Sequence, residues 1–315
     1  MVHRLPSKSI EKPEQLLPYK RSKLKQICSK DEEVNSMSNM PQVLYHYTSL
    51  ETLALILTNK SLCFNTLINV DDIEEAETSD MGLFGKYVYV SCWTDEEQES
   101  IAMWQLYTPN MHGVRIQLPI YPFKKHYYKA GELYFSKDTT SYIDMKKLYE
   151  ENKALIPPNF PQLKPVIYTT DEALLRPQIR FGDRIEDYIE VLSNKHSGKK
   201  HCEIQYNLSP LGKYKNEVWS FQKEWRYWIS MSPWGMKESE HPTFEKQLEF
   251  AKRLEDIAAK PPYERFFVNL SEEALLQMQI VFGPRMSEAE KILAKHLLRG
   301  SGLDGKWRDS GLRIR

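Results

Sequence analysis

Two distant segments of this 315-residue chain, residues 44–48 and 221–226, carry side chains that could act together in a reaction. The first segment contains His46, whose imidazole donates or accepts hydrogen bonds near neutral pH. The second contains Glu224, and a fixed carboxylate stabilises positive charge that develops in a transition state. We therefore take His46 and Glu224 as the catalytic candidates.

Both residues also have a structural interpretation. Successive residues of a strand point to opposite faces, so Glu224 and Arg226 share one face of the strand expected there. A salt bridge between them would keep Glu224 ionised, which suits catalysis and structure equally. A histidine in a strand is often a hydrogen-bonded core residue. Both interpretations stay open at the level of the sequence.

Further motifs occur along the chain in a recognisable order. They are Val90-Ser91-Cys92-Trp93-Thr94, Ala102-Met103-Trp104-Gln105-Leu106-Tyr107, His112-Gly113-Val114-Arg115-Ile116, Lys215 and Trp219 before Lys223-Glu224-Trp225-Arg226, and Ile280-Val281-Phe282-Gly283-Pro284-Arg285-Met286. Together they resemble the bacterial family called domain of unknown function 2971 (DUF2971), over about residues 44–303. That resemblance implies little biochemistry.

A more remote resemblance implies a reaction. A strand ending in His46-Tyr47-Thr48, then a helix and a short return strand, resembles the opening of the ADP-ribosyltransferase superfamily. The resemblance implies NAD as a substrate, with His46 holding its ribose and Ser91 in a middle strand–helix unit. It places Glu224 against the nicotinamide ribose, where positive charge builds as the glycosidic bond breaks.

The same resemblance implies a set of cofactor-binding residues, and separately we expect no metal site. These residues are His46, Tyr47, Thr48, Ser91, Trp104, Gln222 and Arg226. In transferases that modify arginine, a second glutamate usually stands two positions before the catalytic one, and this chain has Gln222 there. The difference argues against arginine as the acceptor and leaves NAD hydrolysis open.

The strands and helices expected to position these residues do not follow a repeated βαβ pattern. Strands are predicted over residues 44–47, 61–64, 87–93, 113–118, 132–136, 166–169, 225–230 and 278–282. Helices are predicted after Ser49, from Thr94 through Tyr107, over residues 185–193 and 244–259, and after Ser287. Arg115 and Gln117 should lie on a solvated strand face. The pattern predicts an α+β fold of mixed and antiparallel sheets flanked by helices, and the resemblance implies an ADP-ribosyltransferase-like arrangement.

The composition describes an ordinary globular protein. The 43 basic and 43 acidic side chains balance, so no global field favours nucleic acid or a membrane surface. Four scattered cysteines indicate reduced thiols. No apolar run reaches the roughly 18 residues that span a bilayer, and the first residues lack the apolar core of a signal peptide. We therefore expect a cytoplasmic protein with no membrane partner.

Charge is nevertheless uneven along the chain. Residues 1–30 contain eight basic and two acidic side chains, which suits either a nucleic-acid or partner contact or a solvated leader helix. The composition changes near residues 36–41, so we divide the chain into a basic leader, 1–40, and a single domain, 41–315. Residues 71–80 contain six acids, which could bind a divalent cation or form a solvated loop.

Two functions remain under consideration. The first is an NAD-using, ADP-ribosyltransferase-like enzyme that acts on protein or nucleic acid or hydrolyses NAD, as a toxin or defence effector. The second is a non-catalytic module that senses a nucleotide or binds a protein. No P-loop, dinucleotide-binding, nucleophile-elbow or HExxH motif points elsewhere. The enzyme requires His46, Ser91 and Glu224 to converge on one cleft, with imidazole and carboxylate within about 10 Å; placement on opposite sides would remove its support.

Overall fold

Strand-forming sequences from the whole length of the chain meet in one large sheet. The computed structural model describes residues 40–184, 204–237 and 258–314, with residues 186, 187, 190, 246, 249, 252, 253 and 256. Residues 1–39 of the predicted leader and much of the predicted helices over 185–193 and 244–259 lie outside the described residues; residues 246, 249, 252 and 253 of the latter are helical. Gln42–Arg315 form one compact unit.

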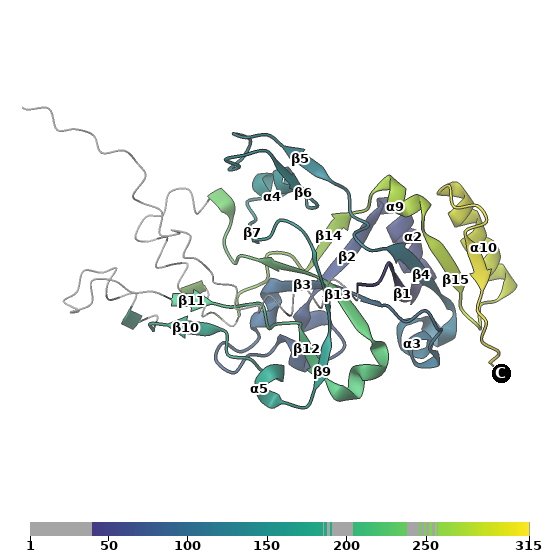
Figure 1. Ribbon diagram of the computed structural model, residues 1–315, viewed down its shortest axis with the longest axis horizontal. Coiled ribbons are helices and arrows are strands. Elements are labelled where there is room, and N and C mark those ends of the chain that lie inside the picture. The colour runs from purple at the N-terminus through teal and green to yellow at the C-terminus, as the bar shows by residue number, and fades with distance from the viewer. Residues whose placement is uncertain are drawn as a thin grey trace, which may run out of the picture. The chain divides into compact units, whose positions relative to one another are not determined.

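The main sheet joins early, middle and late parts of the chain (Figure 1). Its strands run in the order β14-β2-β3-β1-β4-β15-β16, and β13 pairs with β3, β7 and β8. Their bounds are β1 Val43–Ser49, β2 Ser61–Thr66, β3 Val88–Thr94, β4 Gly113–Pro119, β7 Leu155–Ile156, β8 Gln162–Pro165, β13 Glu224–Met231, β14 Arg265–Asn269, β15 Gln279–Phe282 and β16 Trp307–Asp309. Most pairs are antiparallel, but β15 and β16 are parallel, so the sheet is mixed.

Shorter elements surround this sheet. Three two-stranded ribbons are formed by β5 His126–Tyr128 with β6 Thr139–Ser141, β9 Ile167–Thr169 with β12 Tyr214–Asn216, and β10 Arg180–Gly182 with β11 Ile204–Tyr206. In the described ranges the α-helices are α2 Leu50–Asn59, α3 Ile101–Tyr107, α4 Met145–Glu150, α5 Glu172–Leu175, α9 Glu272–Leu276 and α10 Glu288–Gly300. Short 3₁₀ helices are η2 Leu67–Asn69, η3 Ile73–Ala76, η4 Phe84–Tyr87, η5 Pro109–Met111 and η6 Glu217–Gln222. The predicted α+β class is therefore confirmed, while the ADP-ribosyltransferase-like arrangement stays a prediction.

Local sequence signals explain several of these boundaries. The Ser49 hydroxyl accepts a hydrogen bond from the Thr52 amide at 3.1 Å and caps α2, as predicted. At the start of α10, Ser287 and Glu290 form the predicted reciprocal capping box. None of the helices in the described ranges has the length and apolarity needed to cross a membrane.

The main sheet divides along one of the two edges of β3. One edge pairs with β13 along its whole length. The other edge is shared, because β2 pairs at Val90 and Tyr89 whereas β1 pairs at Thr94. Residues 91–93 on this edge lie between the two partners. The sheet thus has two halves that meet at β3.

Strand register determines which side chains share a face. Tyr45 of β1 lies opposite Thr94 of β3, which lies opposite Glu224 of β13. Directly opposed residues project to the same side, and the next residue along each strand projects to the other side. We call the first side the Glu224 face; it carries Tyr45, Tyr47, Cys92, Thr94, Arg115, Glu224 and Arg226. The second is the His46 face, with His46, Thr48, Ser91 and Trp93.

The helix predicted from Thr94 begins instead at Ile101. Thr94 remains the last residue of β3, and its hydroxyl donates to the Lys223 carbonyl at 3.1 Å. It also accepts from the Glu96 amide, which makes a turn rather than a helix. Ser100 caps the helix by accepting from the Met103 amide.

Two further expectations are wrong. The structure has no strand at residues 132–136, because this segment turns the chain between β5 and β6 and Leu133 has a positive φ of 50°. Arg115 was expected on a solvated face, but it is only 1% exposed. Its guanidinium is stacked on Tyr45 and Tyr47, at 4.4 and 5.8 Å from the ring centroids. Aromatic neighbours on β1 therefore cover a position that the alternating pattern assigns to solvent.

Candidate functional site

A buried cluster of four charges surrounds the catalytic candidate Glu224. Arg226 is bound between two carboxylates: its Nη2 donates to Glu75 Oε1 at 3.0 Å and to Glu224 Oε2 at 2.9 Å. Lys215 Nζ lies 3.2 Å from Glu75 and 3.3 Å from Glu224. All four side chains are at least 94% buried. Two acids and two bases thus cancel one another inside the protein.

The cluster determines the ionisation of Glu224. Burial by itself would raise the pKa of this carboxyl, but Arg226 and Lys215 lower the pKa to about 2. Burial likewise opposes the charge of Lys215, yet Glu224 and Glu75 raise the pKa of its ammonium group. Glu224, Lys215 and Arg226 are therefore each held in the charged form by their oppositely charged neighbours.

This ionisation predicts a specific acid sensitivity. The folded pKa of Glu224, about 2, lies below the ordinary value of 4.5, so the stabilisation is present above pH 4.5 and is lost as the pH falls toward 2. Urea unfolding of Glu224→Gln between pH 6 and 2.5 should show a flatter decline than the wild type. The exposed Glu217→Gln provides the control. Parallel curves for wild type and Glu224→Gln would contradict the assignment.

Two further sets of polar side chains lie beside the cluster. The thiol of Cys92 hydrogen-bonds Glu224, and burial together with this carboxylate raises the pKa of the thiol well above its usual value. The Gln222 amide donates to the Tyr107 hydroxyl, which donates to Asp71 Oδ2 at 2.5 Å. The carbonyl oxygen of the Gln222 side chain is buried and accepts no hydrogen bond from the described residues.

His46 has a different environment. Its Nδ1 lies 2.8 Å from the Cys92 carbonyl, at the divided edge of β3. A carbonyl oxygen only accepts, so Nδ1 carries the proton. Burial lowers the pKa of His46 more than this bond raises it, which favours the neutral ring. The ring lies 5.1 Å from that of Trp93, whose indole nitrogen donates to Ser91. These contacts are those of a structural histidine.

The three predicted residues do not converge on one cleft. His46 and Ser91 lie on the His46 face and Glu224 on the Glu224 face. Both His46 and Glu224 contact residue 92, the first through its carbonyl and the second through its thiol. The main chain of β3 therefore separates the imidazole from the carboxylate.

The other predicted cofactor-binding residues are divided in the same way. Thr48 is on the His46 face, while Tyr47, Gln222 and Arg226 accompany Glu224. Trp104 reaches the Glu224 face from α3; its ring meets that of Tyr47 edge-on at 4.9 Å and is fully buried. Binding of a ligand to Trp104 requires that its present neighbours move.

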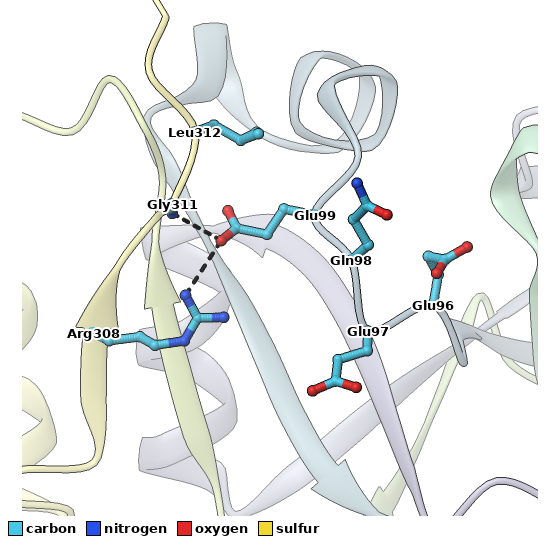
Figure 2. Close-up of a pocket in the computed structure, with 7 residues that line it drawn as sticks. All are labelled: Glu96, Glu97, Gln98, Glu99, Arg308, Gly311 and Leu312. Carbon is cyan, nitrogen blue, oxygen red and sulfur yellow. Dashed lines mark hydrogen bonds and ion pairs between the residues drawn. The ribbon is translucent and has the colours of Figure 1, made fainter.

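Two open pockets lie near these residues. The larger, about 590 Å³, is lined by Glu96, Glu97, Gln98, Glu99, Arg308, Gly311 and Leu312 (Figure 2). The smaller, about 460 Å³, includes Thr48 and Tyr107. Among the residues predicted for the cofactor, Thr48 alone lines either of them. The larger pocket lies between the loop after β3 and the end of the chain, a combination that the sequence motifs do not indicate.

The six acids of residues 71–80 are partly solvated, with Asp71 and Asp80 exposed and Asp72 and Glu75 buried. No group of three His, Cys, Asp or Glu side chains in the described ranges is arranged to hold a metal ion. Each acid instead binds a particular partner: Asp71 accepts from Tyr107, Asp72 caps η3, Glu74 and Glu77 pair with Arg176, Glu75 joins the charge cluster, and Asp80 accepts from the amides of Ile179 and Arg180.

Sequence reasoning missed several residues of this region as candidates. Lys215 and Cys92, which stand in the quoted family motifs, complete the surroundings of Glu224 together with Glu75, which was considered only as one of the acids of residues 71–80. Arg115 and Glu99 were likewise not selected. A lysine or glutamate in a short polar stretch gives no sign that it is buried, since its partners come from distant segments.

Comparison with known proteins adds one match. No curated protein and no solved structure matches the chain. The matched segment of the family model includes Trp104, Arg115, Lys215, Gln222, Glu224 and Arg226 and excludes His46, Glu75 and Ser91. Residues 103–227 match the family described as "Protein of unknown function (DUF2971)", which supports the resemblance to that family found in the sequence.

Proposed function

We propose that this protein is a non-catalytic nucleotide-sensing module. The observation that carries the proposal is the state of Glu224, which is ion-paired with Arg226 and Lys215 on the sheet face opposite His46. A catalytic carboxylate must direct its charge at the reacting sugar. Here that charge is directed at two buried cations, so the arrangement favours structure over catalysis.

The Glu224 face contains groups suited to a nucleotide. Tyr45 and Tyr47 provide aromatic rings, and Arg115 lies against both. The guanidinium is permanently charged and has planar donors that match phosphate. Its one hydrogen bond from Nη1 goes to the Glu97 carbonyl, and its buried Nε has no acceptor among the described residues. A buried cation with an unpaired donor supports recognition of an anion.

The proposal predicts binding without turnover. Thermal unfolding should shift upward with ADP-ribose or NAD, because a ligand at 100 times its Kd stabilises the folded state by about 2.7 kcal/mol. Incubation with NAD should release no nicotinamide. The absence of a shift with any nucleotide would contradict sensing and favour a protein-binding role.

An NAD-using transferase or hydrolase is the second candidate. One observation favours it: β1, β3 and β13 are neighbours, so the strands of His46, Ser91 and Glu224 lie side by side. NAD turnover by the wild type that is lost in Glu224→Gln would establish this alternative and reject the first. Equal rates in both proteins would exclude Glu224 as a catalytic residue.

A further inference from the structure

The end of the chain crosses the loop that follows β3. After β16, Glu99 holds the next residues through one carboxylate: the Ser310 hydroxyl donates to Oε2, and the Gly311 amide donates to Oε1 at 3.0 Å. Arg308 adds an ion pair to Oε1 at 3.3 Å. Figure 2 shows Glu99 directed at Gly311 and Arg308 across the larger pocket. A single side chain therefore supplies most of the polar attachment of this segment.

Beneath this segment is an apolar cluster. Leu312 and Ile314 pack against the buried residues Tyr47, Trp104, Met111 and Val281. The Trp104 indole donates to the same Glu99 carboxylate at 3.1 Å. Residues 310–314, which we call the tail, thus pack against a cluster that contains Tyr47 and Trp104, the two aromatic residues that the sequence predicted for a cofactor.

The tail itself is weakly held. Ser310, Leu312 and Ile314 are half-buried, and Gly311 and Arg313 are exposed. The Ser310 hydroxyl and the Gly311 amide both donate to one carboxylate, so loss of that acceptor breaks both bonds and leaves the Ser310 amide on the Phe282 carbonyl. Segments with few buried contacts open locally at low cost in free energy. The tail is therefore suited to reversible detachment.

Detachment would uncover a surface with complementary parts. Tyr47 and Trp104 offer rings for stacking, and Arg115 contacts Tyr47 from β4. Aromatic rings with a nearby guanidinium bind a base and a phosphate in one ligand. Burial would raise the pKa of Glu99, but hydrogen bonds from Ser310, Gly311 and Trp104 and the charge of Arg115 lower it, so the carboxylate that holds the tail also lies near this cation.

We propose that the tail is a displaceable strap over a nucleotide-binding surface formed by Tyr47, Trp104 and Arg115. The proposal rests on the sensing function above and names the site and its regulation. A nucleotide competes with Leu312 and Ile314 for the aromatic rings, and the release of the tail is the signal. A ligand of this kind binds with an apparent affinity reduced by the fraction of molecules in the attached state.

Hydrogen exchange of the full chain tests the strap without any ligand. The amides of Ser310, Gly311 and Leu312 should be protected, since each donates to an acceptor in the folded state. Ser310→Asp places a second negative charge beside Glu99 and should speed exchange at Gly311 and Leu312 at least tenfold. Ser301→Asp changes an exposed serine after α10 whose hydroxyl donates to the Leu297 carbonyl, and it should behave as wild type. Unprotected tail amides in the wild type would overturn the strap.

Ligand binding tests the surface separately. Leu312→Asn, which adds no charge, should bind ADP-ribose at least threefold more tightly than wild type, and ADP-ribose should speed tail exchange in the wild type. Arg115→Met in the Leu312→Asn protein should weaken ADP-ribose binding at least tenfold while leaving adenosine binding within twofold.

The outcomes distinguish the two proposals. Nucleotide binding that is equal in wild type and Leu312→Asn, with no change in tail exchange, would overturn the strap as a regulator and leave sensing in place. Protected tail amides without nucleotide binding in either protein would reject the sensing function and the proposed surface.

Discussion

Arg226→Met is expected to destabilise the protein by about 3–5 kcal/mol, because it leaves two buried carboxylates without their common partner. Arg226 is fully buried and binds both Glu75 and Glu224. Methionine fills a similar volume, so the loss measures charge rather than a cavity. Lys215 remains between the two carboxylates and cannot neutralise both. Urea unfolding at pH 7 gives the difference in free energy.

Arg176→Met is the matched control. Arg176 also contacts several carboxylates, those of Glu74, Glu77 and Glu172, but it does so at the surface. Exposed ion pairs are screened by water and salt, so this variant should lose far less stability than Arg226→Met. Equal losses of stability in the two variants would show that burial does not account for the contribution of the charge cluster to stability. We also expect added salt to have little effect on the free energy of unfolding that Arg226→Met loses.

Trp104→Ala should also cost about 3–5 kcal/mol, the usual range for removing a buried large aromatic side chain. The indole has no exposed surface and joins α3 to β1 through Tyr47. Its nitrogen donates to Glu99, so truncation also removes one of the bonds that orient the carboxylate holding the tail. The variant should therefore lose protection of the tail amides as well as global stability.

Leu106→Ala separates the effect of burial from that of helix composition. Leu106 is also in α3, but it is 54% exposed. Its truncation should leave the unfolding midpoint and tail exchange close to wild type, because surface substitutions usually change stability by less than about 0.5 kcal/mol. If Trp104→Ala were as stable as Leu106→Ala, the packing of α3 on the sheet would need revision.

The positions of the main strands along the chain could be predicted from local patterns. Apolar and β-branched runs predicted β1, β2, β3, β4, β13 and β15 to within a few residues, and Ser49 and Ser287 identified two helix starts. These features depend on the periodicity of a strand and on hydroxyl capping, which involve residues close in the sequence. Thr94 shows where such signals fail, since its hydroxyl binds the carbonyl of Lys223 from a distant segment.

Glu224 and Arg226 illustrate the same division within the candidate site. Their shared strand face follows from their spacing, and so does the possibility of an ion pair. The presence of Glu75 and Lys215 does not, because these residues reach the cluster from a 3₁₀ helix and from another strand. Catalytic and structural roles use the same residue types, so the partners decide between them.

His46 gives the clearest separation between what local sequence determines and what only the tertiary structure decides. The sequence alone determined that His46, Ser91 and Glu224 stand on strands, and that His46 faces away from Tyr45 and Tyr47. Only the pairing of β1 with β3 and of β3 with β13 decided that Glu224 lies on the face of the tyrosines and His46 on the other. The period of two fixes faces within a strand, but a shift of one residue between strands would reverse them. Register depends on contacts between distant segments, and no local pattern contains it.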